Sequence, residues 1–154
     1  MKKTLAFFLS LLSFQFAFSQ SVNWDSLTVP NIYPAQVEMF KFSRHSKKDI
    51  VFLGNSITFW TDWGELIKSK HVKNRGIPGD VTFGVLRRLD EVIDGKPSKV
   101  FILIGINDLG RNIPDSIILR NYERMIDRIK AGSPRTRIYW QTLLPTNETF
   151  NKLD

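Results

Sequence analysis

Short apolar runs alternate with stretches of helical spacing along this chain. The apolar runs cover residues 49–53, 71–74, 99–104 and 137–142, and each predicts a β-strand. The first and third runs are continuously apolar, which is typical of strands covered on both faces. Apolar residues recur at helical spacing over 81–92 and 117–129, and a shorter helix is expected over 63–69. This alternation predicts an α/β fold with a parallel sheet, right-handed crossovers and helices on both faces.

The N-terminal residues have the layout of a secretory signal peptide. Lys2 and Lys3 precede a mostly apolar run over 5–18, and small residues near its end predict cleavage after Ser19. The alternative is an uncleaved membrane anchor, but about 14 residues span only about 21 Å as a helix, against a hydrocarbon core of about 30 Å. We therefore expect a protein exported to the periplasm or the extracellular space, with no stable membrane anchor after cleavage.

The remaining residues, 20–154, are enough for one domain with a hydrophobic core. Residues 20–36 are polar and contain two prolines, which predicts an extended lead-in. The chain has no cysteine, so packing alone must hold the fold and no thiolate metal site is possible. No cluster of histidine and acidic residues has metal-ligand spacing, and we expect no cofactor.

The net charge is modest and scattered. It is +7 for the whole chain and falls to +5 when Lys2 and Lys3 are removed. The densest basic stretches are 44–48 and 135–137. Nucleic-acid binding would call for a concentrated basic face with interleaved aromatics, so nucleic acid is not expected as a partner. We expect only some attraction of this positively charged surface to anionic polymers or lipid headgroups.

Ligands of parallel α/β sheets bind beyond the carboxyl ends of the strands. The first expected strand is followed by Gly54-Asn55-Ser56-Ile57-Thr58, which would place the Ser56 hydroxyl where a helix begins. On this segment alone, Ser56 could be a nucleophile or simply the N-cap of that helix.

Two further loops follow the second and third expected strands. One is Asn74-Arg75-Gly76-Ile77-Pro78-Gly79-Asp80, whose glycines suit a backbone that offers N–H groups, or a turn that needs positive φ. The other is Gly105-Ile106-Asn107-Asp108, where Asn107 is a neutral donor or the start of an Asx-turn. Together the three loops supply a hydroxyl and neutral donors at one edge, which is what acyl transfer requires.

These three blocks, in this order and spacing, resemble those of the SGNH hydrolases, also called GDSL-like lipases or acylhydrolases. The resemblance covers roughly residues 36–148. The sequence over residues 81–93 and 121–130 is similar to that of a bacterial branch of this family. This branch resembles the catalytic subunits of platelet-activating-factor acetylhydrolase. The resemblance implies a three-layer α/β/α fold with a flavodoxin-like sheet, and a serine esterase activity.

The resemblance also implies roles for individual residues. Ser56 would be the nucleophile, and an oxyanion hole would consist of the backbone N–H groups of Ser56 and Gly76 and the side-chain amide of Asn107. Asn74 and Asp108 would brace the loops. Core packing is the expected role of three nearby aromatic residues that could otherwise line an acyl pocket: Trp60, Trp63 and Phe83.

The sequence departs from the family pattern in two places. Asn55 stands where the family name records an aspartate, which should affect loop bracing more than chemistry. The Asp-x-x-His block that would supply the catalytic Asp and His is absent from this chain. Neither His45 nor His71 has an acidic residue three positions before it, and both are expected to be structural. We therefore expect a fragment that lacks the last strand and the C-terminal helix of the fold.

Two functions remain open at this point. The first is an exported ester hydrolase that acts on a small acyl ester of a carbohydrate or lipid through an acyl-enzyme on Ser56. The second is a catalytically inactive remnant that binds acylated carbohydrate or lipid. A nucleotide binder is disfavoured because both phosphate-binding glycine motifs are missing, and an ordinary α/β-hydrolase because Thr58 replaces the second elbow glycine. The oligomeric state is left open.

Overall fold

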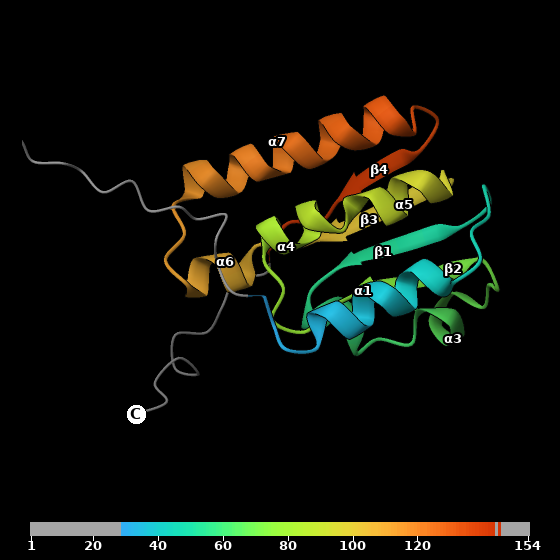
Figure 1. The fold of residues 1–154 in the computed structure, drawn as a ribbon, viewed down its shortest axis with the longest axis horizontal. Coiled ribbons are helices and arrows are strands. Elements are labelled where there is room, and N and C mark those ends of the chain that lie inside the picture. The colour runs from blue at the N-terminus through green and yellow to red at the C-terminus, as the bar shows by residue number, and fades with distance from the viewer. Residues whose placement is uncertain (1–28, 144, 146–154) are drawn as a thin grey trace, which may run out of the picture.

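The computed structural model describes residues 29–143 and 145, which form a parallel sheet of four strands in the order β2-β1-β3-β4. Every neighbouring pair is parallel, and the strands point the same way in Figure 1. The predicted α/β fold is thereby confirmed, with strand bounds that differ by one or two residues from those expected. The strands are β1 (Ile50–Gly54), β2 (Val72–Gly76), β3 (Lys99–Leu103) and β4 (Arg137–Trp140).

Seven helices accompany the sheet in this part of the chain. The helix expected over 63–69 and the one over 117–129 are present, whereas the pattern over 81–92 is divided between two helices. The break falls at Arg88, whose φ of −108° and ψ of 9° are not helical. The helices are α1 (Tyr33–Phe42), α2 (Ser56–Phe59), α3 (Trp63–Ile67), α4 (Thr82–Arg87), α5 (Leu89–Gly95), α6 (Ile106–Gly110) and α7 (Asp115–Gly132).

The expectation of an extended lead-in up to residue 36 is wrong from Tyr33 onward, where α1 begins. Pro34 lies in the first turn of this helix, where the missing N–H costs nothing because that position has no intrahelical partner. Tyr33 and Phe40 are its buried residues, and they pack with Ile77 of the loop after β2. Residues 20–28 of the expected lead-in, like the residues expected to form a signal peptide, lie outside the described residues.

Helices cover both faces of the sheet, as predicted. Because side chains alternate along a strand, Val51 and Leu53 of β1 face one side and Phe52 faces the other. Phe52 stacks on Trp63 of α3 at a ring distance of 3.9 Å. The main core lies on the first side, between the sheet and α4, α5 and α7: Val51, Leu53, Val85, Leu86, Leu89, Val92, Val100, Ile102, Ile104, Met125 and Ile129.

In the described part of the chain, none of the helices has the length and apolar character needed to cross a membrane. The longest, α7, is amphipathic: its buried residues, Ile118, Asn121, Met125 and Ile129, recur at three- or four-residue spacing.

The Tyr33 hydroxyl ties α1 to α4 by donating to the Gly84 carbonyl at 2.6 Å. Burial, reinforced by the nearby Asp80 charge, raises the pKa of Tyr33 to about 12. The unfolded chain releases this proton near pH 10, so the stabilisation is complete below pH 10 and is lost as the pH rises toward 12. We predict that Tyr33→Phe costs about 1 kcal/mol at neutral pH, the usual net contribution of one hydrogen bond.

Urea unfolding of both proteins from pH 7 to pH 12 measures this difference. The advantage of the native tyrosine should shrink above pH 10 and reverse by about pH 11, because each pH unit in this range costs about 1.4 kcal/mol. A constant difference across that range would show that the Tyr33 hydroxyl ionises as easily in the folded state as in the unfolded state.

Candidate active site

Ser56 lies at the carboxyl end of β1 as the first residue of α2. Asn55, not Ser56, is the N-cap: its side-chain Oδ1 accepts the Ile57 N–H at 3.0 Å. Ser56 is half-buried, and its hydroxyl has no hydrogen-bond partner among the described residues. Ser56 is therefore not the N-cap of α2, and its hydroxyl remains available at the carboxyl end of β1. Asn55 itself is fully buried, and its Nδ2 has no partner in the described part of the chain.

Gly76 brings the second loop against the turn that carries Ser56. A Cβ at Gly76 would lie 2.3 Å from the Phe59 nitrogen and 2.8 Å from the Asn55 carbonyl oxygen, so only glycine fits there. Asn74 fastens the same turn, because the two N–H bonds of its Nδ2 are shared among three carbonyls at 3.0 to 3.1 Å, those of Thr58, Phe59 and Thr61. These hydrogen bonds are the physical basis of the bracing role expected for Asn74.

The Gly76 N–H is used inside its own loop, which contradicts its expected availability as an oxyanion donor. It donates to the Asn74 Oδ1 at 2.9 Å, and Gly76 is buried. The physical reason is the same close packing: Asn74 must reach α2 with its Nδ2, and this places its Oδ1 over the Gly76 N–H.

Gly79, three residues further on, presents its backbone differently. Asp80 N–H donates to the Ile77 carbonyl at 3.1 Å, and Gly79 has φ of +77°. With Pro78 before it, this is the pattern of a type II turn, in which the Gly79 N–H takes no part in the turn hydrogen bond. Gly79 is partly exposed, and no other described residue accepts from its N–H.

Asn107 connects the third loop to the second. Its Nδ2 donates to the Asp80 carbonyl at 2.8 Å, and the side chain is half-buried. Because an amide group has two N–H bonds, one remains for a ligand. Its neighbour Asp108 is fully buried and accepts from the Thr82 N–H at 3.0 Å and the Thr82 hydroxyl at 2.5 Å. Burial raises the pKa of Asp108, and these donors oppose the rise.

A buried ion pair connects the first two loops to each other. Arg88 donates to the Asp80 Oδ2 through Nε at 3.0 Å, and its terminal nitrogens donate to the Arg75 carbonyl at 2.9 Å and the Gly54 carbonyl at 3.0 Å. Both side chains of the pair are almost completely buried. Burial raises the pKa of Asp80, and the Arg88 cation counteracts that rise. Arg88 thus joins the ends of β1 and β2 to the loop that carries Gly79.

The two histidines lie at the amino ends of the strands, at the opposite end of the sheet from Ser56. His71 directly precedes β2, and its carbonyl accepts the N–H of Ile50, the first residue of β1. His45 precedes β1 and lies 3.8 Å from Glu91 of α5. Since β1 and β2 each span five residues, about 13 Å of strand separates that edge from Ser56. Neither histidine is within hydrogen-bond reach of Ser56.

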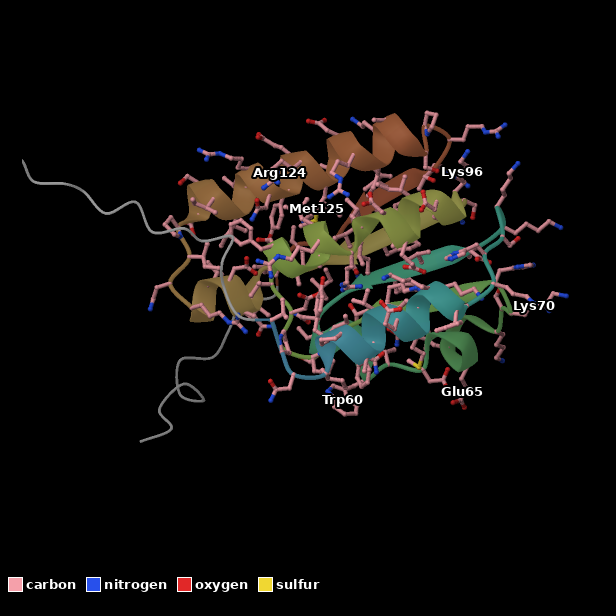
Figure 2. The ribbon with its side chains drawn as sticks, in the orientation of Figure 1. Trp60, Glu65, Lys70, Lys96, Arg124 and Met125 are labelled. Carbon is pink, nitrogen blue, oxygen red and sulfur yellow. The ribbon has the colours of Figure 1, made fainter. Side chains whose placement is uncertain are left out.

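The aromatic residues near Ser56 serve different purposes. Trp63 stacks on Phe52 and donates from Nε1 to the Thr58 carbonyl, and Phe83 is buried in a core cluster. Trp60 is 76% exposed at the end of α2, so the expectation of core packing fails for this residue (Figure 2). A separate pocket of about 320 Å³ lies beside α6 and is lined by Asp115 and by five apolar or aromatic residues: Leu109, Ile118, Leu119, Tyr122 and Leu143.

The fold is that of an α/β protein in which a serine hydroxyl and neutral amide groups follow the carboxyl ends of neighbouring strands. The chain matches the model of the GDSL-like lipase and acylhydrolase family over residues 52–154, and it belongs to that family. Among the described residues, no group of three or more His, Asp or Glu side chains could hold a metal ion.

Individual relatives agree with this assignment. The human platelet-activating factor acetylhydrolase IB subunit alpha2 is 28% identical over 116 residues, which cover 71% of this chain and 50% of the relative. The chain thus spans about half the length of the curated relatives it matches.

Two solved structures are similar in fold. A Streptococcus pneumoniae protein provisionally described as a platelet activating factor is 34% identical, with a TM-score of 0.66 over 76% of this chain and 55% of that one. A GDSL-like lipase from Bacteroides thetaiotaomicron is 25% identical, with a TM-score of 0.64 over 74% of this chain and 59% of that one.

We predict that Arg88→Lys destabilises the protein by about 1–3 kcal/mol, because lysine keeps the charge beside Asp80 but leaves a buried carbonyl without its donor. A lysine has one nitrogen and cannot reach Asp80 and both carbonyls at once. Urea unfolding measures the loss. Arg120→Lys, on the exposed face of α7, is the matched control and should stay within about 0.5 kcal/mol of the native protein. Equal stabilities for the two variants would refute a structural role for the Arg88 network.

Proposed function

We propose that this protein is an exported serine ester hydrolase in which Ser56 is the nucleophile. One observation carries the proposal: Asn55 takes over the capping role, which leaves the Ser56 hydroxyl without a partner at the edge where Asn107 offers a spare amide N–H. The same residues, Gly54 to Thr58, gave the sequence pattern that places the serine directly after a strand. The signal peptide expected over 1–19 supports the exported state.

The proposed reaction has two steps. The Ser56 Oγ attacks the acyl carbon and gives its proton to a base, and the collapse of the tetrahedral intermediate releases the alcohol and leaves an acyl-enzyme. Water then attacks the acyl carbon, and the carboxylic acid leaves as Ser56 regains its proton. The oxyanion would accept from the backbone N–H of Ser56, the Asn107 amide and the backbone N–H of Gly79, which replaces Gly76 in this role because the Gly76 N–H is already bonded.

The base must be a group other than His45 or His71, since both lie at the far edge of the sheet. We propose that it is a histidine outside this sequence, supported by an aspartate, because the sequence contains only these two histidines. A serine hydroxyl without an adjacent base is a weak nucleophile at neutral pH. The 154 residues on their own should therefore be nearly inactive.

The substrate is proposed to be a small acyl ester of a carbohydrate or lipid. The apolar pocket beside α6 is adjacent to the Asn107 loop, because Tyr122 lines it and donates to the Ile104 carbonyl at 2.7 Å. A volume of about 320 Å³ is at the small end for ligand pockets, which favours a short acyl group. The name acetylhydrolase, carried by the curated relatives, agrees with a short acyl group.

A second candidate, a binder of acylated carbohydrate or lipid without catalysis, is favoured by the absence of a histidine near Ser56 among the described residues. Labelling with a fluorophosphonate distinguishes the two functions, because the reagent requires an activated serine. We predict specific labelling of the full-length protein and none in Ser56→Ala. Binding of an acylated ligand without any labelling would instead establish the second candidate.

We further predict that Asn107→Ala lowers kcat for a short-chain ester by about 100- to 1,000-fold, the usual effect of losing one oxyanion donor. Asn112→Gly is the matched control, because it removes an exposed amide nearby and glycine tolerates the positive φ of 55° at that position. The control should keep its kcat within about twofold. Steady-state kinetics measures kcat, and thermal unfolding verifies that both variants are folded. Native turnover in both variants would contradict the role of Asn107 as an oxyanion donor.

A further inference from the structure

A basic pocket lies at the edge of the sheet opposite Ser56. Its volume is about 760 Å³, and it is bordered by the segments that lead into β1, β3 and β4. Four cationic side chains line it: Lys47 before β1, Lys96 at the end of α5, Arg135 between α7 and β4, and Arg137 at the start of β4. Figure 2 shows Lys96 at the end of the molecule that is farthest from α6 in Figure 1.

The charge in this pocket is uncompensated. No acidic residue lines it, and none of the four cations forms an ion pair with another described residue. Asp94, two residues before Lys96, is exposed but does not line the pocket. Four like charges around one concavity repel one another, and protein surfaces ordinarily intersperse the two signs. An anionic ligand would relieve this repulsion.

Helix C-termini account for only part of the arrangement. A cation near a helix C-terminus is favoured by the helix dipole, which explains Lys96 after α5. Lys47 and Arg137 lie at strand beginnings, where no such dipole acts. The dipole also gives no reason for the cations to surround a cavity.

The walls of the pocket are held rigidly. The Thr136 hydroxyl donates to the Pro97 carbonyl at 2.6 Å, and the Arg137 N–H donates to the Ser98 carbonyl at 3.1 Å. The Ser98 hydroxyl donates to the Asp49 carbonyl at 2.9 Å. These bonds connect the backbones of the three segments to one another, so the four exposed cations project from one connected frame.

We propose that this pocket binds a ligand with two or more phosphate groups, independently of ester hydrolysis at the opposite edge. Arginine presents a planar fork of N–H donors that matches phosphate oxygens, and two of the four cations are arginines. A single phosphate would occupy little of about 760 Å³, whereas a chain of phosphates could contact cations on both sides of the cavity. The source of the phosphates is either a soluble oligophosphate or the headgroups of an anionic lipid.

Isothermal titration of the full-length protein with tripolyphosphate at low salt tests the soluble source. Co-sedimentation with phosphatidylglycerol vesicles, against phosphatidylcholine vesicles, tests the lipid source. We expect binding in at least one arm, and binding that weakens with added salt. The double variant Arg135→Gln, Arg137→Gln should bind about tenfold more weakly or worse, because it loses two charge-assisted contacts. Lys47→Gln with Lys96→Gln tests the remaining two cations in the same way.

The control is Lys41→Gln with Arg120→Gln, which removes the same net charge from exposed positions of α1 and α7. This control should bind as tightly as the native protein, and circular dichroism should show that all variants are folded. The proposal is overturned if neither phosphate source binds, or if the control loses as much affinity as the pocket variants. The latter result would assign the attraction to overall charge.

Discussion

The buried pair of Arg88 and Asp80 is the constraint on which the geometry of the candidate site depends. A guanidinium this deep in the protein is costly unless each of its donors is satisfied, and here a carboxylate and two backbone carbonyls accept from it. Those carbonyls belong to Gly54 and Arg75, near the ends of β1 and β2. The helix that would otherwise run from Thr82 into α5 is interrupted at Arg88, so that its side chain reaches all three acceptors. The ends of β1 and β2, the loop that carries Asp80 and the break between α4 and α5 are therefore held together by the same side chain.

Close backbone packing completes that arrangement. Gly54 and Gly76 are partners in the sheet register, and a Cβ at either would lie 2.3 Å from a neighbouring backbone atom. This contact lets the turn carrying Ser56 approach the second loop, and Asn74 then fixes the turn through three carbonyls. Catalysis by neutral donors depends on such rigidity, because a donor that must reorganise during the reaction loses much of its effect.

The sequence predicted the sheet because its strands follow strong local patterns. The continuous apolar runs could hardly be anything but buried strands, and parallel strands bring their carboxyl ends to one edge. Helix α1 was missed because only Tyr33 and Phe40 of its residues are buried, too few to produce a clear periodicity. The break at Arg88 was missed because a charged residue in a helical pattern suggests a solvent-exposed face, whereas Arg88 is buried by partners distant in sequence.

The error at Gly76 has a similar origin. Two glycines three residues apart indicate that one backbone position is special, but the choice between them depends on where Asn74 directs its side chain, which is a tertiary contact. A local signal was present: Pro78 followed by Gly79 is typical of a type II turn with its central N–H directed away from the turn bond. His45 and His71 illustrate the opposite case, because their positions before strands were sufficient to exclude them from the site.

The two edges of the sheet differ in how their charges are arranged. At the carboxyl edge Asp80 is paired with Arg88 and Asp108 accepts hydrogen bonds from Thr82, so each buried carboxylate has its own partners. At the amino edge, Lys47, Lys96, Arg135 and Arg137 have no such partners in the described part of the chain. About 13 Å of strand separates the two ends, so none of these cations is in direct contact with the turn that carries Ser56. In the proposed mechanism the oxyanion would depend on donors in direct contact with it, so the orientation of Asn107 and Gly79 would matter more than the positive charge of the protein.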